Sequence, residues 1–351
     1  MNGTVPRSKV FPFADILTSE PETSPSFLSS SSTIHRTNHS KSNMIAIGCQ
    51  EARYTRAFKS WLDECLKLYE SEGYALVHVV HMGSLTMVLL ASWWMIPDIS
   101  LQSGFATKNI FNRVFGNKGA VYASVRYKHL SILFVNCHFS AHQERVAERR
   151  NDYKKLSTKI NMRFPLNDTT KQRCLRDGED DLKQKFDHIF WFGDLNYRIN
   201  GTRSMVDLLL KRNDQEVMLS NDQLIAEMKR EHVLSGFQES EILFPPSYKF
   251  DTYKQKQASS SSRWSCRRVA PCPTDFQFGC GANVYDTSNK CRIPSWTDRI
   301  LYCTRGLSED DSQTGGGIEC ESYLCALDVM DSDHKPVFGQ YIVPLKTEGR
   351  K

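Results

Sequence analysis

The run from Phe186 to Ile199 limits the possible folds of this chain more than any other stretch of its sequence. Residues 186–192 are rich in aromatic and β-branched side chains, a composition typical of a buried strand. Gly193 permits a tight exit from that strand, and Asp194 and Asn196 follow at once. We expect this pair to lie at the carboxyl end of the strand, where active sites of layered α/β proteins are commonly built. An Asx-type turn, in which both side chains only bond the backbone, is the alternative.

Strand and helix patterns alternate through the rest of the chain. With no internal linker and no repeat, this mixture predicts a single α/β domain of layered sheets and helices. The predicted strands are 45–48, 75–80, 85–91, 120–127, 130–137, 187–193, 298–303, 323–329 and 336–343. The predicted helices are 58–69, 144–160, 204–211 and 221–229. The basic residues of the second helix are predicted to form a solvated surface: Arg145, Arg149, Arg150, Lys154 and Lys155.

Both ends and one internal stretch are predicted to lie outside the packed domain. Residues 1–43 are rich in Ser and Thr and carry little periodic hydrophobicity, which indicates a disordered leader. A single packed domain is expected over 44–344, followed by a short tail at 345–351. Residues 254–283 combine a serine tract with basic residues, prolines and glycines, a composition typical of a surface insertion.

The composition is that of an ordinary globular protein, since 40% of the 351 residues are hydrophobic and 24% are charged. The net charge of +5 is compatible with anionic partners but identifies none by itself. The eleven cysteines are odd in number and contain no C-x-x-C pair, which predicts reduced thiols in a cytosolic protein. A local metal or redox site is the alternative for Cys266, Cys272 and Cys280, which share one loop.

No segment has the pattern of a membrane-spanning helix or of a secretory signal. The longest apolar run, Leu85–Ile96, is shorter than the about 20 residues with which a helix crosses a bilayer. Acidic residues follow a broken apolar patch near the amino terminus, unlike the continuous apolar region of a signal. The chain is therefore predicted to be cytoplasmic.

Further polar motifs lie at predicted strand ends. Glu51 follows the first strand, where it is placed to hold Mg²⁺, a cation that prefers oxygen ligands. His138 ends another strand, and Asp333 and His334 precede the last one. Asp298 enters a strand and is able to orient a histidine through a ring nitrogen. Each of these alone is also explained as a surface acid or a structural histidine.

Together, these motifs resemble the inositol polyphosphate 5-phosphatase family, a branch of the Mg²⁺-dependent exonuclease, endonuclease and phosphatase folds. The resemblance runs from about Met44 to Pro344, and a second set of residues, 221–228 with 236–239, is most similar to the type IV phosphoinositide 5-phosphatases. The motifs that carry it are Trp191–Ile199, Pro294–Leu301 and Ser332–Phe338, supported by Gly116–Ala120, Asn136–His142, Glu148–Tyr153 and Pro246–Asp251.

The resemblance implies a DNase I-like fold, a four-layered sandwich of two mixed β-sheets flanked by helices. It implies Mg²⁺-dependent hydrolysis of the 5-phosphate of phosphoinositides such as PI(4,5)P2 or PI(3,4,5)P3. The expected partners are these lipids at cytosolic membrane faces, with soluble inositol phosphates as a further substrate class. Nucleic acid is not an expected partner, although a nuclease of the same fold is a rival interpretation.

The resemblance also implies roles for the polar residues. Glu51 matches the metal-binding glutamate, Asp194 the acid that orients or activates water, and Asn196 its partner on the phosphate. His334 matches the histidine beside the scissile phosphate, held by Asp298. Asp333 supports the site, and His138 matches a second histidine that contacts phosphate.

Substrate choice has its own candidates in the resemblance. Tyr248, Lys249, Lys290 and Arg292 match positions that grip the neighbouring 4-phosphate, although an exposed basic turn also explains the last two. Asn117 and Lys118 are expected at the rim of the site. The apolar stretch 96–105 is either a membrane-facing surface or part of a strand end.

One departure from the family concerns the amino terminus. Family members open with a strand that carries a Thr-Trp-Asn motif, and residues 1–43 contain no match to it. We therefore expect the sandwich to lack its first strand and the neighbouring strands to lose ladder partners. A catalytically impaired phosphoinositide-binding module is the alternative function that follows from this expectation.

Overall fold

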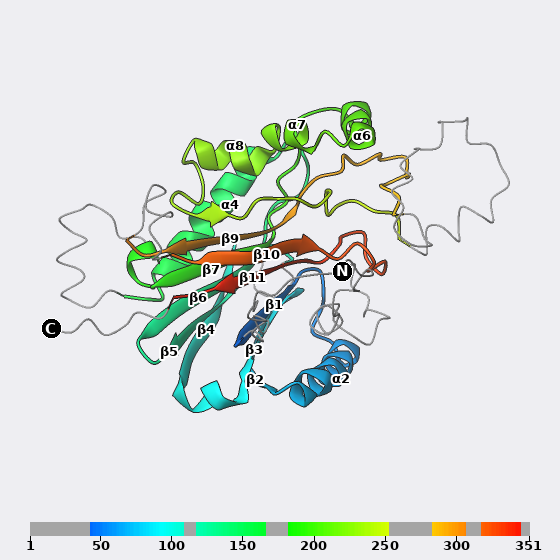
Figure 1. Ribbon diagram of the computed structural model, residues 1–351. Helices are drawn as coiled ribbons and strands as arrows, with labels where there is room; N and C mark the ends of the chain where they lie inside the picture. The colour runs from blue at the N-terminus through cyan, green and yellow to red at the C-terminus, as the bar shows by residue number, and fades with distance from the viewer. Residues whose placement is uncertain (1–42, 109–116, 166–181, 253–282, 307–316, 345–351) are drawn as a thin grey trace, which may run out of the picture.

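The larger β-sheet of the protein contains the strand that ends in Asp194. In the computed structural model, which describes residues 43–108, 117–165, 182–252, 283–306 and 317–344, six strands form this sheet in the order β4-β5-β6-β7-β9-β8 (Figure 1). Strands β6 and β7 run parallel, and the other neighbouring pairs are antiparallel. The strands are β4 (Ile99–Thr107), β5 (Gly119–Tyr127), β6 (Leu130–His138), β7 (His188–Asp194), β8 (Gln238–Glu239) and β9 (Asp298–Thr304).

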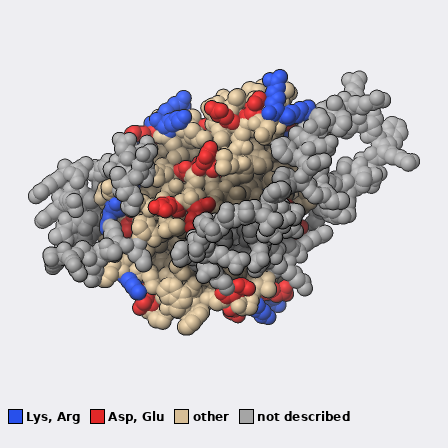
Figure 2. Space-filling model, viewed as in Figure 1, with Lys and Arg blue, Asp and Glu red and all other residues tan. Residues whose placement is uncertain are grey.

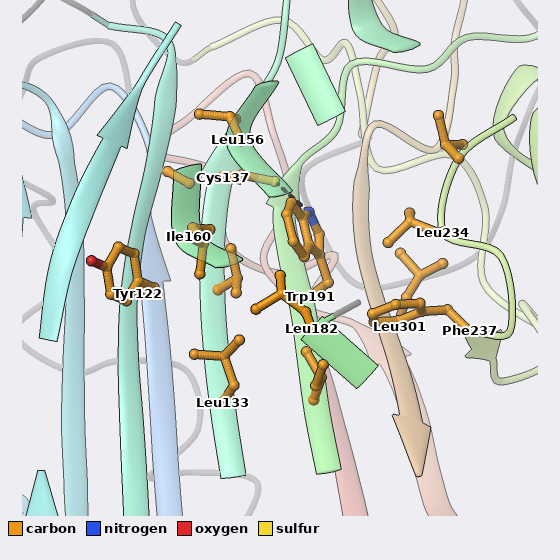
Figure 3. Packing of buried hydrophobic residues seen from close by; sticks show 14 of the residues in the cluster. Tyr122, Leu133, Cys137, Leu156, Ile160, Leu182, Trp191, Leu234, Phe237 and Leu301 are labelled. Carbon is orange, nitrogen blue, oxygen red and sulfur yellow. Dashed lines mark hydrogen bonds between the residues drawn. The ribbon is translucent and has the colours of Figure 1, made fainter. Parts of the chain in front are cut away.

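Strands β6 and β7 occupy the middle of this sheet. Every residue of β6 is buried, and so is every residue of β7 except Gly193. Their continuous apolar sequence follows from this position, because both faces of the strands contact other layers. Trp191 packs into the cluster on one face, and its indole N–H donates a hydrogen bond to Cys137 Sγ at 3.1 Å (Figure 3).

Two smaller sheets cover the opposite face of the larger sheet. The first has the order β1-β3-β2, and the second pairs β10 with β11, all antiparallel. Met87 of the first and Tyr341 of the second pack in one cluster with Phe134 and Phe190 of the larger sheet. Among the described residues, β1 and β11 each have a hydrogen-bonded neighbour on one side only. The strands are β1 (Met44–Cys49), β2 (Tyr74–Met82), β3 (Leu85–Ser92), β10 (Glu319–Cys325) and β11 (Val337–Ile342).

Helices form the two outer layers (Figure 1). Helix α2 (Arg56–Ser71) begins at Thr55, whose hydroxyl accepts a hydrogen bond from the backbone N–H of Phe58 at 3.2 Å. Its apolar side packs on the first small sheet, through residues that include Phe58 and Leu62. The other outer layer packs on the larger sheet and contains α4 (Val146–Asn161), α8 (Gln223–Lys229) and the short helix η2 (Leu182–Gln184). The four layers confirm the predicted sandwich.

The remaining helices lie at the margins of these layers. They are α6 (Arg203–Arg212), α7 (Gln215–Ser220) and the 3-10 helix η1 (Trp93–Asp98). Residues 96–98 of the apolar stretch lie in η1 and residues 99–105 in β4, where Phe105 is exposed, so a membrane-facing surface stays a prediction. Helix α7 was not predicted from the sequence, and β10 lies at 319–325 rather than the predicted 323–329. The strand was misplaced because its sequence lacks a clear apolar pattern. It contains the polar residues Glu319, Glu321 and Ser322, since this two-stranded sheet is partly exposed.

The prediction of a solvated basic face on α4 is wrong for Arg149, and Arg150 is only partly exposed. Arg149 is fully buried and donates to the carbonyl oxygens of Ser140 and His142 at 3.2 and 2.6 Å. Arg150 forms a two-pronged ion pair with Glu227 of α8, with N–O distances of 2.7 and 3.0 Å. These cations hold α4 to neighbouring segments, a role that spacing along one helix does not reveal.

Several predicted features lie outside the described residues. They are the leader up to residue 42, nearly all of the insertion 254–283, the tail 345–351, and Cys266, Cys272 and Cys280. In the part of the chain that the structure describes, no helix is long and apolar enough to span a bilayer. On the face in Figure 2, the basic side chains of the described residues lie apart from one another around the margins and form no stripe.

Candidate active site

Three neighbouring strands of the larger sheet bring their polar residues to one edge. His138 ends β6 directly opposite Asp194, the last residue of the parallel strand β7. Asp298 begins the antiparallel strand β9 and is the register partner of Asp194 on the other side. Adjacent strands lie about 5 Å apart, so the sheet itself places these three residues within reach of one another.

Asp194 is a buried carboxylate surrounded by hydrogen-bond donors and positive charge. Its Oδ2 lies 3.0 Å from His138 Nε2, and its Oδ1 accepts from the backbone N–H of Asn196 at 3.0 Å. Burial alone would raise the pKa of Asp194, but His138, His334 and Lys118 outweigh it and hold that pKa well below its usual range. The hydrogen bond from the Asn196 N–H is the bond expected of an Asx-type turn, so that part of the alternative interpretation is present. The same carboxylate also contacts His138, so it is part of the candidate site as well.

Asn196 lies in a left-handed backbone conformation, with a φ of 56°. Its side-chain Nδ2 donates to Asp194 Oδ2 at 3.0 Å and to the Phe139 carbonyl at 3.2 Å. Its Oδ1 accepts from Arg198 Nη2 at 2.6 Å. The amide is therefore bonded to protein groups at each polar atom, and it holds the Asp194 carboxylate in place.

His334 reaches the same edge from a different segment. Its Nδ1 lies 2.9 Å from Asp298 Oδ2, which also accepts from the hydroxyls of Ser247 and Thr297 at 2.8 and 2.9 Å. Burial disfavours the charged imidazolium, but Asp298, Asp194 and Asp333 outweigh burial and raise the pKa of His334. With Nδ1 held by Asp298, Nε2 is the ring nitrogen that can meet a ligand.

Lys118 lies closer to the centre of the site than the predicted rim. Its Nζ contacts His138 Nε2, and the charges of Asp194 and Glu51 both act on it. Burial lowers the pKa of Lys118, although the two carboxylates oppose this shift. Asn117, by contrast, is exposed, and its side-chain oxygen accepts from the Ser84 hydroxyl at 3.2 Å.

Glu51 follows β1 and is the predicted metal ligand. It has a φ of 56°, and the preceding Gln50 donates from Nε2 to Asn136 Oδ1 of β6 at 2.6 Å, which ties the end of β1 to the larger sheet. The described residues contain no group of three or more His, Cys, Asp or Glu side chains that could enclose a metal. Mg²⁺ commonly binds through one or two carboxylates together with water and substrate phosphate. A single glutamate whose charge acts on Lys118 together with that of Asp194 fits that mode.

The predicted 4-phosphate residues divide into two groups. Tyr248 contacts the His334 ring in a tilted arrangement, with ring centroids 4.4 Å apart, and Lys249 Nζ lies 3.5 Å from Asp333 Oδ2. Lys290 and Arg292 lie in the loop 283–292, which is more exposed. Within the described residues, no hydrogen bond or ion pair joins these two side chains to the carboxylate and histidines at the sheet edge.

Three residues that support the site were not predicted from the sequence. Arg198 contacts Asn196, and the hydroxyls of Ser247 and Thr297 hold Asp298. All three lie within motifs that the sequence does single out, which is the available signal. Their roles depend on contacts with segments that are distant along the chain.

Comparisons with known proteins agree with this fold. The model for the endonuclease/exonuclease/phosphatase family 2 matches residues 14–275 and 267–340. The inositol polyphosphate 5-phosphatase domain of SpSynaptojanin, in complex with inositol (1,4)-bisphosphate and calcium, shares 23% identity and a TM-score of 0.63, covering 87% of this chain and 76% of that one. A Cimex nitrophorin in its ferrous NO complex has a TM-score of 0.60 at 18% identity, covering 88% and 89%. Because such different proteins share the fold, the fold alone does not assign an activity.

Curated relatives narrow the family. Phosphatidylinositol polyphosphate 5-phosphatase type IV of Homo sapiens is 31% identical over 312 residues, which cover 87% of this chain and 41% of that protein. Phosphatidylinositol 3,4,5-trisphosphate 5-phosphatase 2 of Sus scrofa is 31% identical over 250 residues, covering 71% and 17%. The chain thus spans less than half the length of these relatives. It belongs to the endonuclease/exonuclease/phosphatase family 2 and, within it, to the inositol polyphosphate 5-phosphatases.

Proposed function

We propose that this chain hydrolyses the 5-phosphate of phosphoinositides such as PI(4,5)P2 or PI(3,4,5)P3 at the cytosolic face of membranes. The names of its curated relatives support this reaction. The inositol bisphosphate and calcium bound to the SpSynaptojanin domain support a phosphorylated inositol as ligand and a divalent cation as cofactor.

The opposite pKa shifts of Asp194 and His334 carry this proposal. The pKa of Asp194 is lowered by the surrounding cations despite burial, so its carboxylate is ionised at neutral pH. The pKa of His334 is raised by the surrounding carboxylates despite burial, which favours its imidazolium form. Attack of water on a phosphate monoester requires a hydrogen-bond acceptor and a donor held close together. Asp194 would be the acceptor and His334 the donor, at the same edge of the sheet.

In the proposed reaction, Asp194 orients the attacking water. Its lowered pKa makes it a weak base, so positioning the water contributes more than removing its proton. The water oxygen forms a bond to phosphorus while the bond from phosphorus to the inositol oxygen breaks. His334 and Lys118 face the negative charge of the phosphoryl oxygens. Mg²⁺ held by Glu51 would supply further positive charge at those oxygens.

The decisive experiment measures phosphate release from PI(4,5)P2 vesicles, a soluble inositol phosphate and abasic DNA, each with Mg²⁺ or with EDTA. We expect Mg²⁺-dependent release from the lipid and a loss of about 10²- to 10⁴-fold in the Asp194→Asn variant, with vesicle binding retained. Cleavage of DNA in preference to the lipid would instead support a nuclease.

A second variant tests the proposed grip on the 4-phosphate. Lys290→Ala should lose activity on substrates that carry a 4-phosphate and keep it on those that lack one, because a cation is removed beside that group only. Lys128→Ala removes an equally exposed cation from the turn between β5 and β6 and serves as the control. Equal losses on all substrates would contradict the role of Lys290.

One observation favours a second candidate function, a phosphoinositide-binding module with impaired catalysis. Strand β1, which precedes Glu51, has a hydrogen-bonded neighbour on one side only among the described residues. A loosely held strand would place the metal-binding glutamate less firmly. Vesicle binding by the unmodified protein without phosphate release would support this alternative.

A further inference from the structure

Arg198 is a buried cation whose contacts differ from those of Arg299, a buried arginine that is paired with carboxylates. It is 5% exposed, and no ion pair joins it to a carboxylate in the described part of the chain. Arg299, by comparison, pairs with Asp222 and Glu239 at 3.0 and 2.5 Å. Buried charges are normally paired because leaving water is costly for them. The guanidinium of Arg198 instead meets polar and aromatic groups of the candidate active site.

The first of these groups is the Asn196 side chain. Arg198 donates from Nη2 to Asn196 Oδ1 at 2.6 Å and from Nε to the Asn196 carbonyl at 3.2 Å. A guanidinium has hydrogen-bond donors and no acceptor. If the Asn196 amide were flipped by half a turn, its Nδ2 donor would face the donors of Arg198, and no hydrogen bond could form. Arg198 therefore selects the rotamer in which Asn196 Nδ2 points at Asp194 Oδ2 and at the Phe139 carbonyl.

The second group is the Tyr248 ring, on the other side of the site. The Arg198 guanidinium lies over this ring at 4.3 Å from its centroid, and the same ring contacts the His334 ring in a tilted arrangement, with centroids 4.4 Å apart. Tyr248 also bridges to His334 and Ser295 through the backbone. The Arg198 guanidinium thus contacts Asn196, in the turn that follows Asp194, and Tyr248, whose ring contacts His334.

We propose that Arg198 is a positioning residue. It fixes both the Asn196 amide and the Tyr248 ring, and it thereby fixes the position of Asp194 relative to His334. Both hydrogens of the Asn196 amide have protein acceptors, so the amide holds the Asp194 carboxylate in place. This inference rests on the proposed phosphatase function for its kinetic consequences, whereas the underlying geometry does not depend on it.

The kinetic test uses Arg198→Lys, which keeps the charge but loses the planar fork and the stacking surface. A displacement of catalytic groups by about 1 Å lowers the rate by about 10²-fold. We therefore expect kcat on PI(4,5)P2 vesicles to fall by about that factor, with KM unchanged. A rise in KM with kcat unchanged would show that Arg198 contacts substrate directly, which would overturn the proposal.

Arg149 offers a matched control. It is equally buried and lies over the Tyr197 ring at 4.9 Å, but its hydrogen bonds go to groups other than Asn196. Arg149→Lys should lower Tm while kcat per folded molecule is retained. If Arg198→Lys and Arg149→Lys lost kcat equally, general destabilisation would explain the Arg198 effect. That result would contradict the proposal.

A readout without turnover separates this proposal from the proposed function. The Asn196 side-chain amide of the full chain is followed by ¹⁵N–¹H NMR in the unmodified protein, Arg198→Lys and Arg198→Met. We expect its hydrogens to exchange slowly in the unmodified protein and much faster in both variants, whether or not any substrate is hydrolysed. Unchanged exchange in folded Arg198 variants would overturn the positioning role, even if the unmodified protein proves to be an active phosphatase.

Discussion

Asp298 shows how single residues set the charge of this site. Its Oδ2 accepts from two hydroxyls and faces His334 Nδ1 at 2.9 Å, so the carboxylate has little freedom to turn away. Its charge is the largest of the contributions that raise the pKa of His334, and together with its hydrogen bond and the charges of Asp194 and Asp333 it outweighs burial. The protonation state of His334 therefore depends on a residue that need not contact the substrate.

The pH dependence of activity should report this pair. A protonated His334 is present below its raised pKa and is lost as pH rises through that value, which gives an alkaline limit to activity. In Asp298→Asn the pKa of His334 should fall, and the alkaline limb of kcat/KM should move to lower pH by about one unit or more. Rates from pH 6 to 10 would measure the shift, and an unmoved limb would contradict the role of His334.

At the scale of elements, helix α6 holds the loop that carries Lys290 and Arg292. Arg203, at the start of α6, donates from Nη1 to the carbonyl oxygens of Asp286 and Arg292 at 2.8 and 2.9 Å. Within the loop, the Asp286 carboxylate accepts from the backbone N–H groups of Ser288 and Arg292. Burial would raise the pKa of Asp286, but hydrogen bonds from the Ser288 side chain and from these two backbone N–H groups outweigh burial and lower that pKa.

Removing the Arg203 guanidinium should loosen this loop without touching the sheet edge. We expect Arg203→Gln to reduce the preference for substrates with a 4-phosphate by about tenfold, because charge-assisted hydrogen bonds are lost. Lys211→Gln, an exposed change on the same helix, is the control. The ratio of kcat/KM for substrates with and without the 4-phosphate measures the effect. An unchanged ratio would show that α6 does not govern the loop.

At the scale of the whole molecule, the sandwich is most complete at its centre and least complete between its smaller sheets. β6 has bonded neighbours on both sides and is buried throughout. β1 and β11 share the same core cluster through Met44, Ala46 and Tyr341, yet each has a bonded neighbour on one side only among the described residues. Such edges expose backbone donors and acceptors to water or to another strand.

Hydrogen exchange should distinguish these regions. Amides of β6 should exchange only on global unfolding, whereas the amides of β1 and β11 that point away from β3 and β10 should exchange much sooner. The amides of β1 that bond β3 provide the internal control. Residue-resolved NMR exchange measures both sets. Uniform protection along β1 and β11 would show instead that another segment of chain pairs with them.

The elements that the sequence predicted well are those whose pattern is repeated and buried. Residues 58–69 lie within α2, and 130–137 and 187–193 nearly coincide with β6 and β7, because their apolar spacing reflects contact with a core. The polar segment 319–325 was misplaced by several residues, since a partly exposed edge imposes little alternation. The roles of the predicted site residues stay predictions until they are assayed.

The sequence by itself determined that a buried strand ends in Asp194 and Asn196, and that Glu51, His138, Asp298 and His334 lie at other strand ends. Local composition and spacing are sufficient for those conclusions. Only the tertiary structure decided that His138 and Asp298 flank Asp194, that Arg149 is buried, and that Arg198 joins Asn196 to Tyr248. The physical reason is that strand register, burial and hydrogen bonding between distant segments depend on how the layers pack, which no local pattern encodes.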